Sequence, residues 1–369
     1  MSGSGFGNIF RITTWGESHG RALGVVIDGC PSGLIMNEEI IQKDLDRRKP
    51  GASKFGTKRK EGDKVEILSG VFEGKTTGTP ISLAVFNQDQ RSRDYSNIMN
   101  VYRPGHADFC FDSKYGFRDY RGGGRSSGRE TLSRVAAGAV ARAALKELGV
   151  EVFAFTKSVG CIEGKTFDKD EVFNNPLCMA DKEAALKASE LMEKAMSDLD
   201  SVGGVVECRI SGMPVGIGEP VFDKLDAALS KAVMSIGAVK GVEFGEGFGA
   251  SLKKGSENND PFIIKDGKTA KAKNSSGGVL GGMSDGDEII LRAAFKPTPS
   301  ISQPQMTVNR EGKEEEIVIK GRHDPIIVPR AVVVVEAMAA VTVLDLMLVN
   351  MASKMENVKK IYNKESLIN

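Results

Sequence analysis

The chain has 369 residues, of which 40% are hydrophobic and 27% are charged, a composition typical of a globular protein that can bury a sizeable core. Its formal net charge of +1 excludes a global field that would draw it to nucleic acid or a membrane, so affinity for anions must come from local clusters. The five cysteines form no C-x-x-C pair and no basic-then-apolar signal pattern is present, which predicts a cytoplasmic protein with no disulfide framework and no metal site.

The first part of the chain predicts short strands and one helix. Residues 10–14 and 24–27 are rich in β-branched residues and alternate with turn glycines, as strands do. A helix is expected over Glu38–Arg48, ending before Pro50. The basic loop 47–60 carries seven Lys or Arg and no acid, and further strands are expected at 65–71 and 81–86.

Residues 91–128 are rich in glycine and arginine and predict a long irregular segment, in which seven aromatic residues argue against disorder. A helix is expected directly after it. Ser127 is a suitable N-cap, and Glu130 three residues later predicts a capping box. Apolar residues then repeat with a helical period until Gly149 ends the helix.

The second half predicts helices at 181–199 and 222–235, strands at 205–210 and 289–295, and a glycine-rich turn at 277–282. Residues 253–274 are polar and lysine-rich, which indicates a solvated excursion. The apolar stretch 331–352 contains Glu336 and Asp345, so a buried helix or strand–helix pair explains it better than a membrane span. Without a linker or repeat, residues 1–369 are expected to form one layered α+β or α/β domain.

The three histidines lie in unusual surroundings, flanked by glycine, proline or charged residues. His19, His106 and His323 all lack a periodic apolar context, and none has metal-ligand spacing. Histidine is the natural general acid or base near neutral pH, so these loops are candidates for catalysis. A structural role for each histidine is the alternative.

Arginines cluster between Arg91 and Arg134, where eight Arg accompany a single Lys. Arg125, Ser126 and Ser127 stand just before the predicted helix, where free backbone N–H groups and the helix dipole favour an anion. The run predicts a phosphate cradle that is not a Walker A loop, with a solvated arginine turn as the alternative. The loop 296–300 adds a cation and two hydroxyl groups between prolines.

Together, these segments resemble the chorismate synthase family over nearly the whole chain. No single motif decides the match, but their order and number do. The matching segments are 16–20, 47–51, 89–92, 103–108, 119–127, 277–282, 296–298 and 321–325.

The resemblance implies an α+β fold, a layered sandwich of helices between β-sheets in a single large domain that assembles as a homotetramer. It implies a lyase that eliminates phosphate from 5-enolpyruvylshikimate 3-phosphate by anti 1,4-elimination to give chorismate. The reaction belongs to the shikimate pathway and requires reduced FMN without net redox change.

The family's functional residues can be carried over one at a time. His19 would protonate the leaving phosphate, His106 would stabilise the reduced flavin, and Asp324 would act with the flavin as base. The residues that would hold FMN are Arg125, Ser126, Ser127, Gly237, Ala238, Gly281, Lys296, Thr298, Ser300 and Arg322. The residues that would bind the substrate's phosphate and carboxylates are Arg48, Arg103 and Arg129.

Two features leave questions open. Lys54 stands where the family often has arginine, and a lysine lacks the guanidinium fork, so its role is open. The chain lacks the large insertions of members that reduce their own flavin, so an external flavin reductant is expected, and direct use of NADPH stays open. Two other classes of protein compete with this interpretation. One is a non-enzymatic RNA-binding protein with an RGG-like segment, and the other is a phosphatase or phosphotransferase that uses the same anion cradle.

Overall fold

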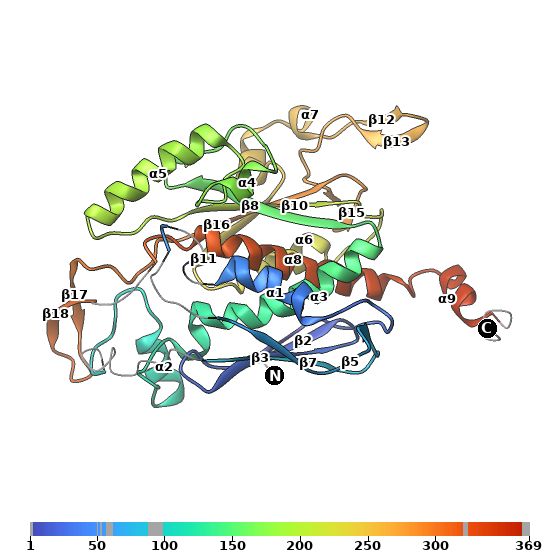
Figure 1. Ribbon diagram of the computed structural model, residues 1–369. Helices are drawn as coiled ribbons and strands as arrows, with labels where there is room; N and C mark the ends of the chain where they lie inside the picture. The colour runs from blue at the N-terminus through green and yellow to red at the C-terminus, as the bar shows by residue number, and fades with distance from the viewer. Residues whose placement is uncertain are drawn as a thin grey trace.

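Two five-stranded antiparallel sheets enclose a layer of helices, as Figure 1 shows. The computed structural model describes residues 3–49, 51, 54–56, 62–87, 99–319 and 324–363. The first sheet has the order β1 (Gly5–Phe6), β2 (Arg11–Gly16), β3 (Ala22–Asp28), β7 (Ile81–Phe86) and β4 (Val65–Ser69). The second has the order β11 (Val239–Phe244), β16 (Ile289–Phe295), β10 (Gly204–Ser211), β8 (Glu151–Val159) and β9 (Ile162–Glu163). The expected α+β sandwich is confirmed.

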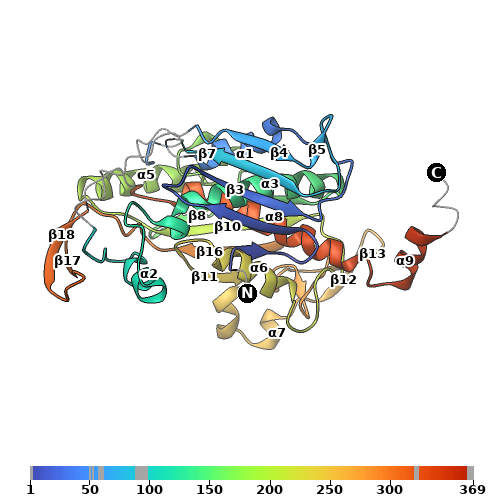
Figure 2. The ribbon, with the colours of Figure 1, turned by 90° about the horizontal axis from the view of Figure 1, so that it is seen from below.

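The helix layer consists of α1 (Glu38–Arg48), α3 (Thr131–Glu147), α6 (Leu225–Met234) and α8 (Val328–Asn350). Helix α3 packs on β3 of the first sheet and on α8, while α8 packs on β8 and β10 of the second. Figure 2 shows the first sheet in front of this layer. Strand residues alternate accordingly: in β2, Ile12 is buried while Arg11 and Thr13 are exposed. The hydrophobic core therefore lies between the sheets and the helices.

Helix α8 resolves the alternatives for the apolar stretch 331–352, because it is one continuous core helix. In the described part of the chain it alone has the length and hydropathy of a membrane span, but 89% of its most apolar window is buried inside the protein. Its two carboxylates have specific partners. Glu336 accepts hydrogen bonds from Arg47 at 2.6 and 3.1 Å, from Arg142 and from the amide of Ala154.

The second carboxylate of α8 ties the N-terminal segment to the core. Asp345 accepts hydrogen bonds from the backbone N–H groups of Asn8, Ile9 and Phe10 at 2.7 to 3.0 Å. Buried carboxylates are costly unless they are paired or hydrogen-bonded. Both acids are satisfied, which explains why they interrupt an otherwise apolar helix.

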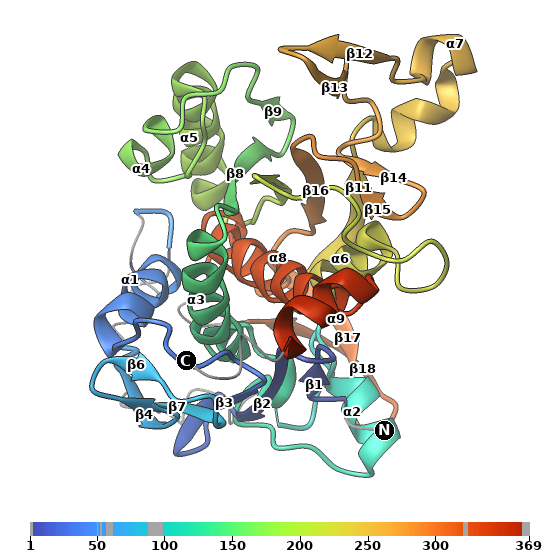
Figure 3. The ribbon, with the colours of Figure 1, turned by 90° about the vertical axis from the view of Figure 1, so that its right-hand side faces the viewer.

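The remaining elements surround the sandwich. At one end, α2 lies beside the hairpin β17–β18 (Figure 1), and the amide of Tyr102 donates to Val308 at 3.1 Å. Figure 3 shows α5 and the hairpin β12–β13 at opposite edges of the second sheet. These peripheral elements are α2 (Asp108–Tyr115), α4 (Glu171–Asn174), α5 (Lys182–Ser197), α7 (Gly255–Asn258), α9 (Met355–Tyr362), β5 (Val71–Phe72), β6 (Lys75–Thr76), β12 (Phe262–Lys265), β13 (Lys268–Lys271), β14 (Val279–Leu280), β15 (Met283–Ser284), β17 (Pro304–Val308) and β18 (Glu314–Val318).

The polar stretch 253–274 combines exposed and buried parts. All four residues of β12 are exposed, whereas the side chain of Lys271 is only 2% exposed. Its ammonium group lies 2.6 Å from Asp285 and 3.4 Å from Asp260, and it donates to Ser276 at 2.8 Å. Lys271 therefore holds the base of this hairpin against the glycine-rich turn.

Several predicted elements differ from the structure. The segment before Ser127 contains helix α2, and the strand expected at 65–71 ends at Ser69 because Gly70 adopts a left-handed φ of 81°. The capping box is wrong. Ser127 caps a 3-10 turn, Gly128–Glu130, by accepting from the amide of Arg129 at 3.3 Å. The Glu130 carboxylate instead binds Thr14 Oγ1 at 2.9 Å and Arg134 Nε at 2.8 Å.

Candidate active site

His19 lies on the tight turn between β2 and β3. The turn is closed by the Gly20 amide, which donates to Glu17 at 3.1 Å, and His19 Nδ1 lies 3.0 Å from Ser18 Oγ. The imidazole packs directly on the backbone of Gly122: a Cβ built there would lie 2.4 Å from Nδ1. The glycine run therefore makes room for His19, a role that the sequence did not indicate because the two segments are far apart in the chain.

Arg48 and Arg129, two of the predicted substrate arginines, meet on one carboxylate. Arg48 Nη2 lies 2.5 Å from Asp63 Oδ2, and Arg129 Nη1 lies 2.9 Å from Asp63 Oδ1. Burial alone would raise the pKa of Asp63, but the charges of Arg48 and then Arg129 hold it below its ordinary value. Asp63 has a left-handed φ of 42° and is 2% exposed, and no motif in the sequence marked it as part of the site.

Arg48 is itself almost inaccessible, with 1% of its surface exposed. Burial, helped by the nearby charge of Arg330, lowers its pKa to about 10 against the favourable charge of Asp63. Its Nε is buried without a hydrogen-bond partner among the described residues. Arg330 Nε donates to the backbone oxygen of Arg48 at 3.0 Å, and Arg330 Nη1 binds Asp324. The predicted base Asp324 is thus linked to the arginine cluster.

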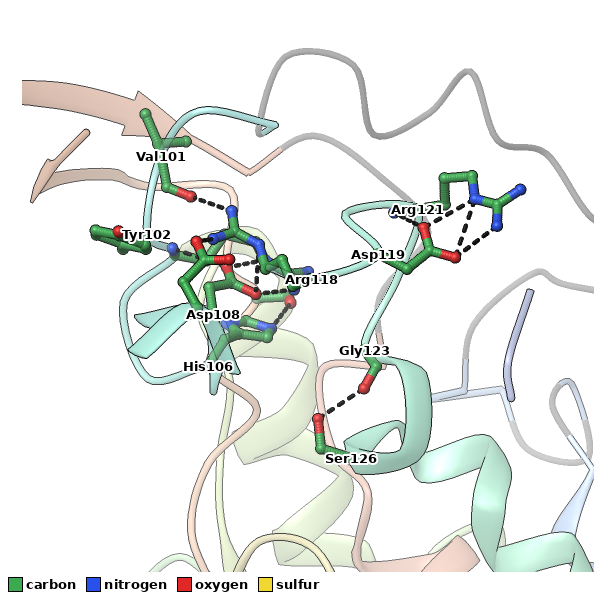
Figure 4. A network of polar contacts seen from close by, with 12 residues as sticks. Val101, Tyr102, His106, Asp108, Arg118, Asp119, Arg121, Gly123 and Ser126 are labelled. Carbon is green, nitrogen blue, oxygen red and sulfur yellow. Dashed lines mark hydrogen bonds and ion pairs between the residues drawn. The ribbon is translucent and has the colours of Figure 1, made fainter. Parts of the chain in front are cut away.

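A second cluster contains Arg103, the third predicted substrate arginine, and its partner Asp108, which Figure 4 labels beside His106. Arg103 binds Asp108 through Nε and Nη2, both at 2.7 Å. Burial would raise the pKa of Asp108, and its hydrogen bonds to Arg103 bring it below its ordinary value. The pair is buried, which fixes the start of α2 and the loop that carries His106.

His106 has a defined hydrogen-bonding state. Its Nδ1 lies 3.0 Å from the carbonyl oxygen of Pro104, and its Nε2 lies 3.0 Å from Ser300 Oγ. Because a carbonyl can only accept, Nδ1 carries the hydrogen and Nε2 accepts from the Ser300 hydroxyl in the neutral ring. Burial, and then the charge of Arg103, lower the pKa of His106, so the neutral form is favoured at neutral pH.

Five of the predicted flavin-binding residues are connected to the His106 loop, either by direct contact or through the segment 296–300. Lys296 Nζ donates to Gly105 at 2.9 Å, and its amide donates to Ala238, next to Gly237, at 3.0 Å. The pKa of Lys296 is lowered by burial and then by the charge of Lys240. The group consists of Gly237, Ala238, Lys296, Thr298 and Ser300.

The predicted cradle residues have other partners in this structure. Arg125 donates to the carbonyl oxygens of Gly16 at 3.0 Å and Thr14 at 3.2 Å, and to Thr14 Oγ1 at 2.6 Å. Ser126 Oγ donates to Gly123 at 2.7 Å (Figure 4). The guanidinium is therefore directed at β2, and the cradle's anion contacts stay a prediction.

Other predicted residues lie apart from these clusters or outside the described residues. Gly281 lies in the β14–β15 turn, and Gly282 accepts from the amide of Leu225 at the start of α6. Gly237 lies beyond the other end of α6, and this helix of 10 residues is about 15 Å long at a rise of 1.5 Å per residue. Lys54 pairs with Glu193 at 3.1 Å in an exposed position. Of the predicted site residues and motifs, the following lie outside the described residues: Arg322, His323 and the motif 89–92.

Comparison with known proteins decides the family. A family model described as chorismate synthase matches residues 10–348. The chain belongs to the chorismate synthase family. A chorismate synthase of Lachnoclostridium phytofermentans is 64% identical, over 99% of this chain and 100% of that protein. One from Methanococcoides burtonii is 58% identical, over 94% of this chain and 96% of that protein.

A solved structure supports the same assignment. The structure described as "Crystal Structure of Chorismate Synthase" matches with a TM-score of 0.75 and 31% identity, over 98% of both chains. The protein is accordingly a carbon–oxygen lyase of the shikimate pathway. Among the described residues, no group of three or more His, Cys, Asp or Glu side chains could hold a metal ion.

Proposed function

We propose that this chorismate synthase converts 5-enolpyruvylshikimate 3-phosphate to chorismate and phosphate, and that it requires reduced FMN without net redox change. The observation that carries the proposal is the gathering of Arg48, Arg129 and Arg330 around the carboxylates of Asp63 and Asp324. A substrate with one phosphate and two carboxylates needs such concentrated guanidinium groups, because the chain as a whole is nearly neutral.

The residues around His106 fit a flavin phosphate or ring. Thr298 Oγ1 is buried without a partner among the described residues, and a Cβ at Gly237 would meet nothing within 4 Å, so a hydroxyl and open space are both free for a ligand. Lys296 supplies a cation beside them. When bound, reduced FMN supplies electron density to the substrate and recovers it. We propose Arg125, Ser126, Ser127, Gly281 and Arg322 as further FMN contacts.

Each candidate catalytic group has a task that its surroundings allow. His19, held at the β2–β3 turn by Gly122, protonates the leaving phosphate. His106 would stabilise the reduced flavin with a ring that burial favours in its neutral form, while its two nitrogens hold Pro104 and Ser300. Asp324 accepts the proton that leaves the substrate, oriented by its contact with Arg330. A positioned acid or base of this kind contributes roughly 10²- to 10⁴-fold to the rate.

The substrate arginines are already paired with carboxylates. Arg48 and Arg129 share Asp63, and Arg103 binds Asp108, so each guanidinium is oriented before the substrate arrives. A preorganised donor costs no reorganisation at the moment of reaction. We propose that these three residues bind the phosphate and carboxylates. We further propose a cytoplasmic homotetramer that receives reduced FMN from an external flavin reductant.

An anaerobic assay with chemically reduced FMN tests the proposal. Chorismate and phosphate should accumulate in large excess over the flavin, and oxidised FMN should support no turnover. Oxidation of one flavin per chorismate would contradict the proposed reaction. His19→Ala and His106→Ala should each keep the melting temperature within a few degrees and lose roughly 10²- to 10⁴-fold in kcat. Near-normal kcat in both variants would remove their assigned roles.

A further inference from the structure

Asn87 connects the His19 turn to Arg129, although no motif in the sequence singled it out. It follows β7 directly, and its backbone amide donates to Arg21 at 3.1 Å. Its side-chain Nδ2 donates to the carbonyl oxygens of Gly20 at 2.7 Å and Glu17 at 3.3 Å, the two ends of the His19 turn. Asn87 thus spans the turn that carries the proposed acid.

The other end of the Asn87 amide contacts Arg129. Arg129 Nε donates to Asn87 Oδ1 at 2.6 Å. The orientation of the amide is unambiguous, because a guanidinium can only donate and the two carbonyl oxygens can only accept. A single amide therefore satisfies a substrate arginine with its oxygen and the His19 turn with its nitrogen.

Arg129 is fixed at its far end as well. Its Nη1 binds Asp63 at 2.9 Å, and Asp63 is held by Arg48 at 2.5 Å. The side chain of Arg129 is 12% exposed and that of Asp63 is 0% exposed. These contacts form one continuous chain of hydrogen bonds from the buried arginine pair to the His19 turn, and the links as far as Asn87 Oδ1 are charge-assisted.

We propose that Asn87 is a positioning residue that couples Arg129 to the orientation of His19. The inference rests on the proposed function, in which Arg129 binds substrate and His19 is the acid. Arg129, held at its far end by Asp63, fixes Asn87 Oδ1, and the rigid amide thereby fixes the carbonyl groups of Gly20 and Glu17 at the two ends of the His19 turn. The His19 ring is constrained on its other side by Gly122, so the turn and the ring move together.

Asn87→Asp tests the inference, because it keeps the shape of the side chain while it exchanges the donor for an acceptor and adds a charge. The carboxylate still accepts from Arg129, but it places an oxygen against the carbonyl groups of Gly20 and Glu17. KM should stay within about threefold of the parent, and kcat should fall roughly 10- to 100-fold, the loss typical of a misplaced catalytic group. Asn174→Asp, at an exposed position in α4, is the control for the added charge and should leave both constants unchanged.

The same substitution in a His19→Ala background distinguishes an effect on the position of His19 from an effect on the rest of the site. If Asn87 acts through His19, Asn87→Asp should cause no further loss of kcat in that background, because residues that act as a unit are not additive. Additive losses, or a parental kcat in Asn87→Asp alone, would overturn this inference and leave the proposed function standing. A parental kcat in His19→Ala would remove the role of His19 and this inference with it, whereas chorismate formation that still required reduced FMN would leave the proposed reaction standing.

Discussion

Gly122→Ala offers a direct test of how the glycine-rich loop contributes to the site. The added Cβ would lie 2.4 Å from His19 Nδ1 and 2.6 Å from Cε1, whereas ordinary contacts begin near 3.4 Å. The imidazole would have to move by about 1 Å, and a misplacement of that size costs on the order of 10²-fold in rate. We therefore expect kcat to fall roughly 10²-fold, with KM changed much less, since Gly122 contacts none of the substrate arginines.

The fold should tolerate this change. The φ angle of Gly122 is not in the left-handed region, so alanine can adopt the same backbone, and the loss of glycine's freedom in the unfolded chain favours the folded state slightly. The obstacle is a side chain that can swing away. The melting temperature should therefore stay within a few degrees of the parent, as thermal unfolding followed by circular dichroism would show.

Gly128→Ala is the matched control. It lies in the same loop, has no left-handed φ, and a Cβ there would meet nothing within 4 Å. Both variants would be assayed anaerobically with reduced FMN over a range of substrate concentrations. If Gly122→Ala and Gly128→Ala had the same kcat, the contact with His19 would have no catalytic consequence and the reasoning would be refuted.

Three other variants test the packing and electrostatics. Glu336→Leu removes the buried carboxylate that Arg47 and Arg142 share and leaves both with Asp44 alone among the described carboxylates, so the free energy of unfolding should fall by about 1.5–3 kcal/mol in urea titrations; an unchanged value would contradict this. Arg125→Ala should lower the melting temperature even without FMN, because the carbonyl groups of β2 lose a donor; an unchanged value would argue against the observed contact. Burial, and then the charge of Arg103, lower the pKa of His106, so on acidification the unfolded state binds a proton before the folded state does. The parent should therefore lose stability relative to His106→Asn as pH falls through about 6.5. If the melting temperatures of the two proteins changed equally between about pH 8 and 5.5, the shift would be contradicted.

The sequence predicted well those elements whose signals are local. Helix α1 and strands β7 and β16 begin and end where their periodicity, proline or turn residues place them. Helix α2 escaped detection because Asp108–Tyr115 mixes aromatic and charged residues without an apolar stripe. The segments that resemble the family also singled out the arginines and histidines as candidates, since residue type and spacing along the chain are what a motif records; their roles stay predictions.

Partners distant in the chain were decided only by the tertiary structure. Arg125 reaches β2, more than 100 residues earlier, because the loop before α3 folds against the first sheet. The capping box at Glu130 fails because Thr14 and Arg134 offer its carboxylate stronger partners than a backbone amide. Asp63 and Asn87 carry no sequence signal, since a single acid or amide becomes important only when folding brings guanidinium groups beside it. Local sequence patterns locate the helices, the strands and the candidate residues. The hydrogen-bond partners of those residues depend on which surfaces the packed sheets and helices bring together.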